Sequence, residues 1–498
     1  MNVNPITRLD YPDLDVIRVE DTYYMVSTTM HFMPGCEILQ SFDLVHWEHV
    51  TYVYETLDHT DAQQLKSGQN IYGQGMWAAS LRYHEGRFYI CFVANDTRKT
   101  YLYTSEKIDG PWKKQLIEGF YHDGSLLFDE DGRNYIVYGN DEIWITELNE
   151  DLTAPKKDGL HRLLVSDHKN PELGYEGSHI QKINGYYYIF LIHSRRDRWM
   201  RTEACFYSDS LEGEFTGGDV LCDDRGYCGQ GVAQGGIVDT PDGKWYAMLF
   251  QDSGAVGRIP ILLPVTWKDH FPVFGQNGHV PEEIEVHSTR PGYIYQPLVG
   301  SDDFCNGLLP RWQFNHDPDP QYYHLDALQG TYTITTREVC TELTQAVNTL
   351  TQRMSYPSCA AEVTVDASAL KEGDVAGLCA LQSCYAAVGI TKHHGKYEVL
   401  MLDKKEDGIL DMTEGTVVES HQMDFRLEAD FCNMKDEARC YYRVNKGDWL
   451  PIGTVHKLYF KLDHFTGCRF GLFCYAAEET GGSACFRDFK YYDVDEIS

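Results

Sequence analysis

Three acidic residues occupy corresponding places in the first part of the chain. Asp13 follows Tyr-Pro, Asp123 follows Tyr-His and Glu176 follows Tyr, and an apolar run of strand length comes shortly after each. An acid beside a Pro- or Gly-bearing turn is often only a turn former. Three acids at matching positions indicate a shared site, because carboxylates without partners are costly to bring together.

The chemistry that such a set serves is glycoside hydrolysis with inversion. One carboxylate takes a proton from water as general base, and a carboxylic acid about 6.5–9.5 Å away protonates the leaving oxygen. A third carboxylate nearby raises the pKa of that acid by like-charge repulsion and keeps it protonated near neutral pH. The alternative is a carbohydrate-binding protein that has lost catalysis, and the presence of all three acids argues against it.

Five similar turn-and-strand units must position these acids. Each has a Gly or Asp three residues before a Tyr, and the tyrosines stand 46 to 65 residues apart. This is the period of four-stranded blades around an axis, so it predicts a five-bladed β-propeller with its site at one end of the axis. A β-sandwich whose hairpins are alike by chance is the alternative. The equivalent tyrosines are Tyr24, Tyr89, Tyr135, Tyr188 and Tyr246.

A second domain follows the repeats. At 275–297 the sequence contains Gly, Pro and Glu without alternation, which indicates a linker, and a new block begins near Asp302. Short apolar or alternating segments without the propeller unit are typical of a β-sandwich. We therefore expect an all-β protein with a catalytic propeller at 1–295 and a jelly-roll-like β-sandwich at 301–498. The indicative segments lie at 360–366, 386–390 and 397–402.

Charge and cysteine usage exclude several functions. The chain has 43 Lys+Arg against 75 Asp+Glu, a formal charge of −32, so neither nucleic acid, which needs a positive field, nor an anionic membrane is expected as a partner. A neutral sugar meets no such objection. The 15 cysteines include no Cys-x-x-Cys spacing, which argues against a metal ribbon. With no signal peptide and no long apolar run, we expect a cytoplasmic protein with reduced thiols.

Several motifs resemble those of glycoside hydrolase family 43, whose members are five-bladed propellers that degrade xylan and arabinan. The second block is similar to the concanavalin-like sandwich that follows the propeller in the β-xylosidase and α-L-arabinofuranosidase branch of that family. The resemblance covers the whole propeller with its motifs in order. It rests on Asn4-Pro5, the Tyr-Pro-Asp13 segment, Ser41 to Trp47, the His122-Asp123-Gly-Ser motif, Glu176-Gly177, Asp302-Asp-Phe and the stretch from Arg311 to His316.

The resemblance implies a role for each acid. Asp13 would be the general base that activates water, Glu176 the general acid, and Asp123 the residue that tunes and orients Glu176. Arg258, in Gly-Arg-Ile-Pro, resembles the arginine with which the family binds the sugar at the cleavage subsite. Trp77, in Met-Trp-Ala, resembles a tryptophan that lines the channel, and a packing tryptophan is the alternative there.

Three further positions complete the predicted site. His31 and Phe32 lie beyond the first inner strand, where we expect part of the pocket wall. Gln234 occupies the place at which many family members have a histidine that ligates a central calcium ion. A glutamine carbonyl is a ligand that calcium accepts, so a structural calcium could bind there even though the histidine is missing, and without a metal Gln234 would be a hydrogen-bonding plug. The chemistry itself requires no cofactor.

The resemblance leads to a specific activity. We expect an inverting, exo-acting α-L-arabinofuranosidase that acts on arabinose- or xylose-bearing oligosaccharides derived from xylan and imported by a bacterial cell. A β-D-xylosidase, or an enzyme with both activities, is the alternative, because both sugars present similar hydroxyl groups to one pocket.

Overall fold

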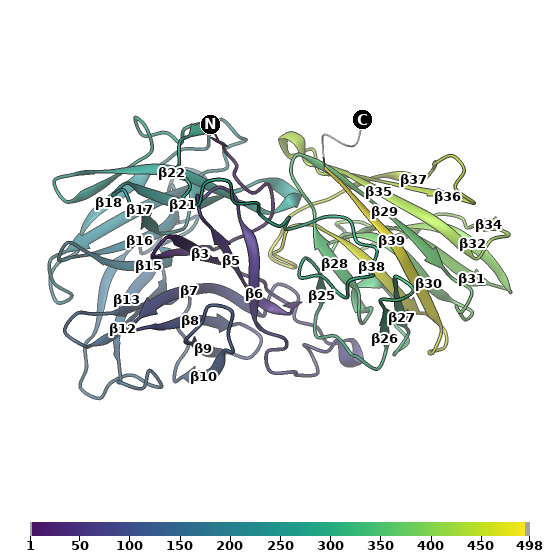
Figure 1. The fold of residues 1–498 in the computed structure, drawn as a ribbon, viewed down its shortest axis with the longest axis horizontal. Helices are drawn as coiled ribbons and strands as arrows, with labels where there is room; N and C mark the ends of the chain where they lie inside the picture. The colour runs from purple at the N-terminus through teal and green to yellow at the C-terminus, as the bar shows by residue number, and fades with distance from the viewer. Residues whose placement is uncertain (1, 494–498) are drawn as a thin grey trace.

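The computed structural model describes residues 2–493 and shows two all-β bodies side by side (Figure 1). The first, purple to teal, is a five-bladed β-propeller, and the second, green to yellow, is a β-sandwich, which confirms the predicted fold class. No helix among the described residues is long and apolar enough to cross a membrane. The helical elements of that range are short 3-10 turns at Lys66–Gly68, Gly254–Val256, Leu343–Gln345 and Cys432–Met434.

Four blades are four-stranded antiparallel sheets that run outward from the axis in chain order, and the fifth has an inner strand in two pieces, β19 and β20. Each of the five equivalent tyrosines lies in the second strand of its blade. The blades are β2(Asp15–Val19), β3(Thr22–Val26), β5(Gly35–Ser41) and β6(Glu48–Tyr54); β7(Met76–His84), β8(Arg87–Ala94), β9(Lys99–Ser105) and β10(Lys113–Ile117); β11(Ser125–Phe128), β12(Asn134–Asn140), β13(Glu142–Leu148) and β14(His161–Ser166); β15(Glu176–Ile183), β16(Tyr186–Ser194), β17(Arg201–Ser208) and β18(Thr216–Leu221); and β19(Val232–Ala233), β20(Ile237–Asp239), β21(Trp245–Asp252), β22(Arg258–Lys268) and β23(Phe271–Phe274).

The turns between first and second strands explain the recurring Gly. In the second blade Glu85 and Gly86 both have positive φ, at 47° and 77°, and in the fourth blade Asn184 and Gly185 have 50° and 84°. Two consecutive residues with positive φ are the mark of the tight hairpin turn that matches the twist of its strands. Glycine enters this region without steric cost, which explains why Gly is found at these turns.

A buried ion-pair network holds the inner strands around the axis. Asp15 on β2 accepts from Arg82 on β7 at 2.7 Å and contacts His179 on β15 at 3.1 Å, and Arg82 also donates to Ser125 on β11 at 2.7 Å. Although burial opposes it, the charges of Arg82 and His179 hold the pKa of Asp15 down at about 2. Four blades are thereby joined beneath the residues that precede their inner strands.

The start of the chain closes the ring on the last blade. The Asn4 side chain donates to the Leu262 carbonyl at 2.7 Å and accepts from the Leu262 amide at 3.1 Å. Arg18 on β2 forms an ion pair with Asp239 on β20, and one apolar core contains residues of the first and fifth blades. The first and last blades are therefore joined by polar and apolar contacts alike.

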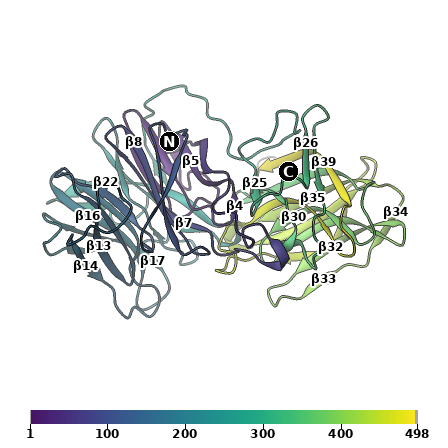
Figure 2. The same cartoon turned by 90° about the horizontal axis from the view of Figure 1, so that it is seen from below.

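The sandwich consists of two antiparallel sheets around a large apolar core. One of its sheets takes in β4(Phe32–Met33) from the propeller, which pairs with β25, and Figure 2 shows the two labels together at the junction. The first sheet contains β25(Gln313–Asn315), β28(Leu350–Arg353), β30(Asp374–Leu381), β31(Ala386–His393), β32(Lys396–Lys404), β33(Leu410–Met412), β34(Thr416–Val418) and β38(Arg469–Ala476); the second contains β26(Tyr323–Asp326), β27(Thr331–Thr335), β29(Ser358–Asp366), β35(Gln422–Asp430), β36(Glu437–Arg443), β37(Leu450–Lys457) and β39(Ser483–Asp493).

The segment between the two bodies is fastened to the propeller. Its short strand β24(Glu283–Ile284) pairs with β1(Asn2–Val3), and the Thr289 amide donates to the Phe42 carbonyl at 2.8 Å. The Phe42 amide in turn donates to the Tyr295 hydroxyl at 2.9 Å. The predicted linker therefore follows the first blade, and the limits at 295 and 301 stay a prediction.

Candidate active site

The three predicted acids stand at the same end of the propeller. Asp13 comes shortly before β2, Asp123 comes two residues before β11, and Glu176 is the first residue of β15. β15 contacts β11 directly, and β2 and β11 both contact β7. Asp13 and Asp123 have positive φ, at 51° and 48°, a conformation that Asp tolerates better than most residues. The backbone thus turns into the strand at the acid itself.

Asp13 lies buried between two donors. Its Oδ1 accepts from the Arg258 guanidinium at 2.8 Å, and its Oδ2 accepts from the Thr28 hydroxyl at 2.8 Å. Arg258 is itself buried, and its amide donates to Asp10 at 2.7 Å. Both oxygens of Asp13 therefore accept hydrogen bonds, an arrangement suited to an ionised general base.

Asp123 and Glu176 form the second part of the site. The Gly177 amide donates to Asp123 Oδ2 at 2.9 Å, so Asp123 holds the start of the strand that carries Glu176. Glu176 Oε2 accepts from the Asn140 side chain at 2.7 Å, and the Glu176 side chain remains 19% exposed. Glu176, which reaches solvent, is thus positioned by Asn140 and, through the Gly177 amide, by Asp123.

His122 lies between the two carboxyl groups. Its Nε2 is 3.6 Å from Asp123 Oδ2 and 3.6 Å from Glu176 Oε2, and among the described residues these three side chains are the group of His, Cys, Asp or Glu whose donor atoms, all within 4.8 Å, could share a metal ion. Chiefly through the charge of Asp123, the pKa of His122 rises to about 9. Burial and the charges of Glu176 and Asp13 raise the pKa of Asp123 although His122 lowers it. His122 therefore keeps its proton near neutral pH.

Trp77 lies beside His122 of the acid cluster. Its ring centre is 5.9 Å from that of His122 and 5.5 Å from that of Phe465. A register shift between Met76 and Ala79 interrupts the β7 ladder at this point. Such a bulge re-aims a side chain, which places the indole next to the acid cluster.

His31 and Phe32 lie in the interface between the two bodies. Both are buried, and the His31 ring centre is 4.8 Å from His316 and 5.0 Å from His464, both of the sandwich. Phe32 belongs to β4, and the Arg469 guanidinium lies 3.5 Å from the centre of its ring. The structure thus brings Trp77 and Arg258 to the acids and places His31 and Phe32 against the sandwich.

Gln234 lies in the break between β19 and β20. Its backbone N–H donates to Glu203 Oε2 at 2.7 Å, and a Cβ on Gly177 would stand 2.8 Å from the Gln234 side chain. Burial raises the pKa of Glu203 well above its usual range, and Glu203 Oε1 has no hydrogen-bond partner. Calcium takes about six to eight oxygen ligands, and these two side chains do not by themselves make such a site. Calcium stays a prediction of the resemblance.

Sequence reasoning did not identify Phe465, the sandwich residue that contacts this site. The Phe465 ring lies 4.3 Å from the Arg258 guanidinium and also contacts Trp77. Asp10 fixes this approach, because it accepts from the Arg258 amide and from the Gly467 amide at 2.8 Å. No local pattern marks Phe465, whereas His122 was visible in the motif and only its role was not recognised.

The fold and the three convergent carboxyl groups define a glycoside hydrolase of the propeller type. The sequence profile of glycosyl hydrolases family 43 matches residues 3–272, and that of the beta xylosidase C-terminal concanavalin A-like domain matches residues 301–492. The chain belongs to glycosyl hydrolases family 43.

Related proteins carry both of the expected activities in their names. A beta-xylosidase of Formosa agariphila is 26% identical over 99% of this chain and 89% of its own length. A non-reducing end alpha-L-arabinofuranosidase of Bacteroides ovatus is 24% identical over 82% of this chain and 79% of its own length. The solved structure of a bifunctional GH43-CE protein of Bacteroides eggerthii has a TM-score of 0.93 and 42% identity over 100% of this chain, which spans 64% of that protein.

Proposed function

We propose that this protein is an inverting, exo-acting glycosidase that removes a terminal pentose from short oligosaccharides derived from xylan. The observation that carries the proposal is the division of the site. Asp13 is held by two donors on one side, and Asp123 and Glu176 lie together around His122 on the other. Inversion needs a base and an acid on opposite sides of the scissile bond, and this division of the site supports it.

The residues then have distinct parts in one step. Asp13 takes a proton from the water whose oxygen bonds to the anomeric carbon, while Glu176 gives a proton to the glycosidic oxygen as its bond to that carbon breaks. Asp123 orients Glu176 through the Gly177 amide. Arg258 and Trp77 bound the place of the sugar ring, and Phe465 packs against both. Since Asp13 and Arg258 are buried, the arrangement favours a chain end over a chain interior.

Two pentoses compete for this site. α-L-Arabinofuranose is the sugar expected from the sequence, and β-D-xylose is equally supported because relatives are named for either activity. Assays of the purified protein on 4-nitrophenyl α-L-arabinofuranoside and 4-nitrophenyl β-D-xyloside separate the two. Failure to hydrolyse either substrate would refute the proposed function.

Inversion is tested by proton NMR of the first sugar released, whose anomeric configuration should be opposite to that of the substrate. Asp13→Asn should lower kcat by about 10²- to 10⁴-fold, the usual contribution of a general base. Asp131→Asn, an exposed acid at the far end of the third blade, is the matched control and should keep wild-type activity. Hydrolysis by Asp13→Asn at the wild-type rate would exclude this base.

A further inference from the structure

A charged hairpin loop stands next to Glu176 on the fourth blade. Residues 195–200 connect β16 to β17, and Ser194 pairs with Arg201 at the base of this loop. Glu176, at the start of β15, pairs with Ile192. The loop therefore projects from the blade at the same end as the general acid, just beyond it.

Trp199 presents an aromatic surface at this place. It is 45% exposed, and the Arg201 guanidinium lies 5.4 Å from its ring centre. The same guanidinium lies 5.4 Å from the centre of the Phe250 ring, and the Arg258 guanidinium also lies 5.4 Å from that centre. Arg258 in turn pairs with Asp13. Alternating rings and guanidinium groups thus connect the exposed Trp199 with the general base.

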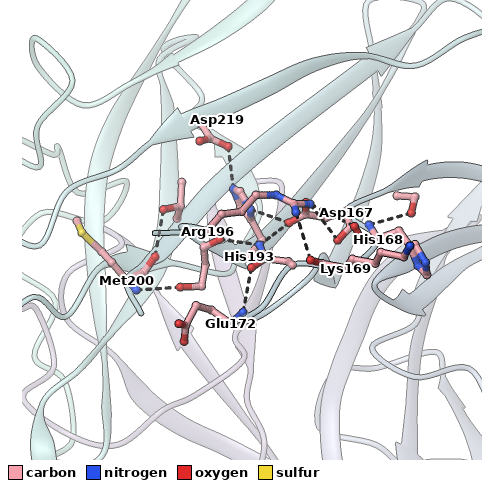
Figure 3. A network of polar contacts seen from close by, with 12 residues as sticks. Asp167, His168, Lys169, Glu172, His193, Arg196, Met200 and Asp219 are labelled. Carbon is pink, nitrogen blue, oxygen red and sulfur yellow. Dashed lines mark hydrogen bonds and ion pairs between the residues drawn. The ribbon is translucent and has the colours of Figure 1, made fainter. Parts of the chain in front are cut away.

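A polar network holds the loop in place (Figure 3). Arg196 forms an ion pair with Asp167 and donates to the Lys169 carbonyl at 3.3 Å. His193 lies between Asp167, at 3.1 Å, and Asp219, at 2.8 Å. These contacts tie the loop to the segment that leads into Glu176, so its side chains are positioned before any ligand arrives, which lowers the cost of binding.

The loop differs in charge from the rest of the chain. Four arginines and one aspartate lie between 195 and 201, in a chain whose formal charge is −32. Arg195 forms close contacts with Asp197, at 2.8 and 3.1 Å, and Arg196 is paired with Asp167. Arg198 is 58% exposed, and its guanidinium is 3.6 Å from Asp197. Arg198 is therefore the cation of the loop that is most available to an anionic ligand.

We propose that residues 195–200 bind the leaving-group part of the substrate, with Trp199 stacked on the sugar beside the scissile bond and Arg198 paired with the carboxylate of a hexuronic acid branch. This rests on the proposed function, because it takes Glu176 as the group that protonates the leaving oxygen. An aromatic face beside a few placed polar groups is the usual composition of a ligand site. A planar guanidinium matches a carboxylate with two parallel hydrogen bonds.

The test uses three substrates with the same terminal pentose. They are an aryl glycoside, a neutral xylo-oligosaccharide, and the same oligosaccharide with a glucuronic acid on the sugar next to the scissile bond. kcat/KM is measured for the wild type, Arg198→Gln and Trp199→Ala. Arg133→Gln, 43% exposed, and Tyr83→Ala, 45% exposed, lie at the opposite end of the propeller and are the matched controls.

Arg198→Gln should reduce the preference for the acidic over the neutral oligosaccharide by about tenfold, the scale of one charge-assisted hydrogen bond. The wild-type preference should also fall as salt is raised, because the attraction is screened. Trp199→Ala should lower kcat/KM for both oligosaccharides about tenfold relative to the aryl glycoside. Both controls should keep the wild-type ratios.

Equal losses on acidic and neutral oligosaccharides in Arg198→Gln, or no loss on either, would overturn the assignment of Arg198. A loss on the aryl glycoside as large as that on the oligosaccharides would overturn the role of Trp199. The proposed function has its own readout, namely hydrolysis of the aryl glycoside by the wild type. If that reaction occurs and the variants do not change the ratios of kcat/KM between the substrates, only the inference about the loop is wrong.

Discussion

The pKa of one histidine at the acid cluster and the pKa values of three histidines at the domain interface are shifted in opposite directions. At the acid cluster, His122 stands 3.6 Å from carboxylate oxygens of Asp123 and of Glu176, and its pKa is raised to about 9. At the interface, the His31 ring packs against the rings of His316 and His464, and burial lowers the pKa of all three, that of His464 to about 3.

The difference comes from the neighbours and not from the depth of burial. Desolvation lowers the pKa of an imidazole in both places, and only the acids reverse it at His122. The ring nitrogens of His31 and His464 have no hydrogen-bond partner, so these rings act as apolar packing surfaces. His122 is therefore charged near neutral pH, and the interface rings are neutral there.

The largest expected effect comes from removing an acid beside His122. Glu176→Gln takes away the proton donor, and kcat for an oligosaccharide should fall by about 10²- to 10⁴-fold. The loss should be smaller for an activated aryl glycoside, whose leaving group needs little protonation. Measurement of kcat on both substrates tests this, and equal losses would show that Glu176 is not the proton donor.

The interface histidines predict instability in acid. Below pH 6.5 the unfolded chain takes up protons that the buried rings do not, so the free energy of unfolding should fall by about 1.4 kcal/mol per pH unit for each ring. His464→Phe should remove one such contribution between pH 6.5 and 4.5. Urea titrations at several pH values measure the slope, and His324→Phe, at an exposed position, is the control. An unchanged slope in His464→Phe would contradict this account.

At the acid cluster the free energy of unfolding should change with pH in the opposite direction. The folded pKa of His122 lies above its ordinary value, so its stabilising contribution is complete below pH 6.5 and is lost as the pH rises through about 9. The wild type should lose roughly 1–3 kcal/mol over that range, and His122→Asn should lose less. Urea titrations between pH 6.5 and 9.5, with His324→Asn alongside, test this. Equal losses in both variants would mean that the acids do not hold the proton on His122.

The smallest expected effect is a difference in activity between variants of two adjacent residues, Phe465 and His464. Phe465 contacts Arg258 at the acid site, whereas His464 faces the interface cluster. Phe465→Ala should lower kcat/KM by about tenfold through loss of this contact, and His464→Phe should keep it within about twofold. Comparable losses in both would show that the two regions are not independent.

Much of the site could be predicted because its residues mark repeated local structure. Asp13, Asp123 and Glu176 each stand at or just before the start of an inner strand, and a blade is a local unit, so their convergence is expected once five units are counted. The resemblance added Trp77 and Arg258, which the structure places beside the acids. The place of His31 in the pocket wall stays a prediction, and the sequence did not indicate that the neighbouring β4 pairs with a sandwich strand far along the chain. A pairing over such a sequence distance leaves no local pattern.

The chain's own pattern of turns, tyrosines and acids determined the number of blades, the end at which the acids stand and the class of reaction. Those features depend on contacts between residues close in sequence, which dihedral preferences and strand periodicity encode directly. Only tertiary packing decided that Phe465 completes the site, that three histidines remain neutral and that His122 becomes a cation. Each of these depends on which distant side chains become neighbours, since the dielectric and the charges around a group exist only after the chain has folded.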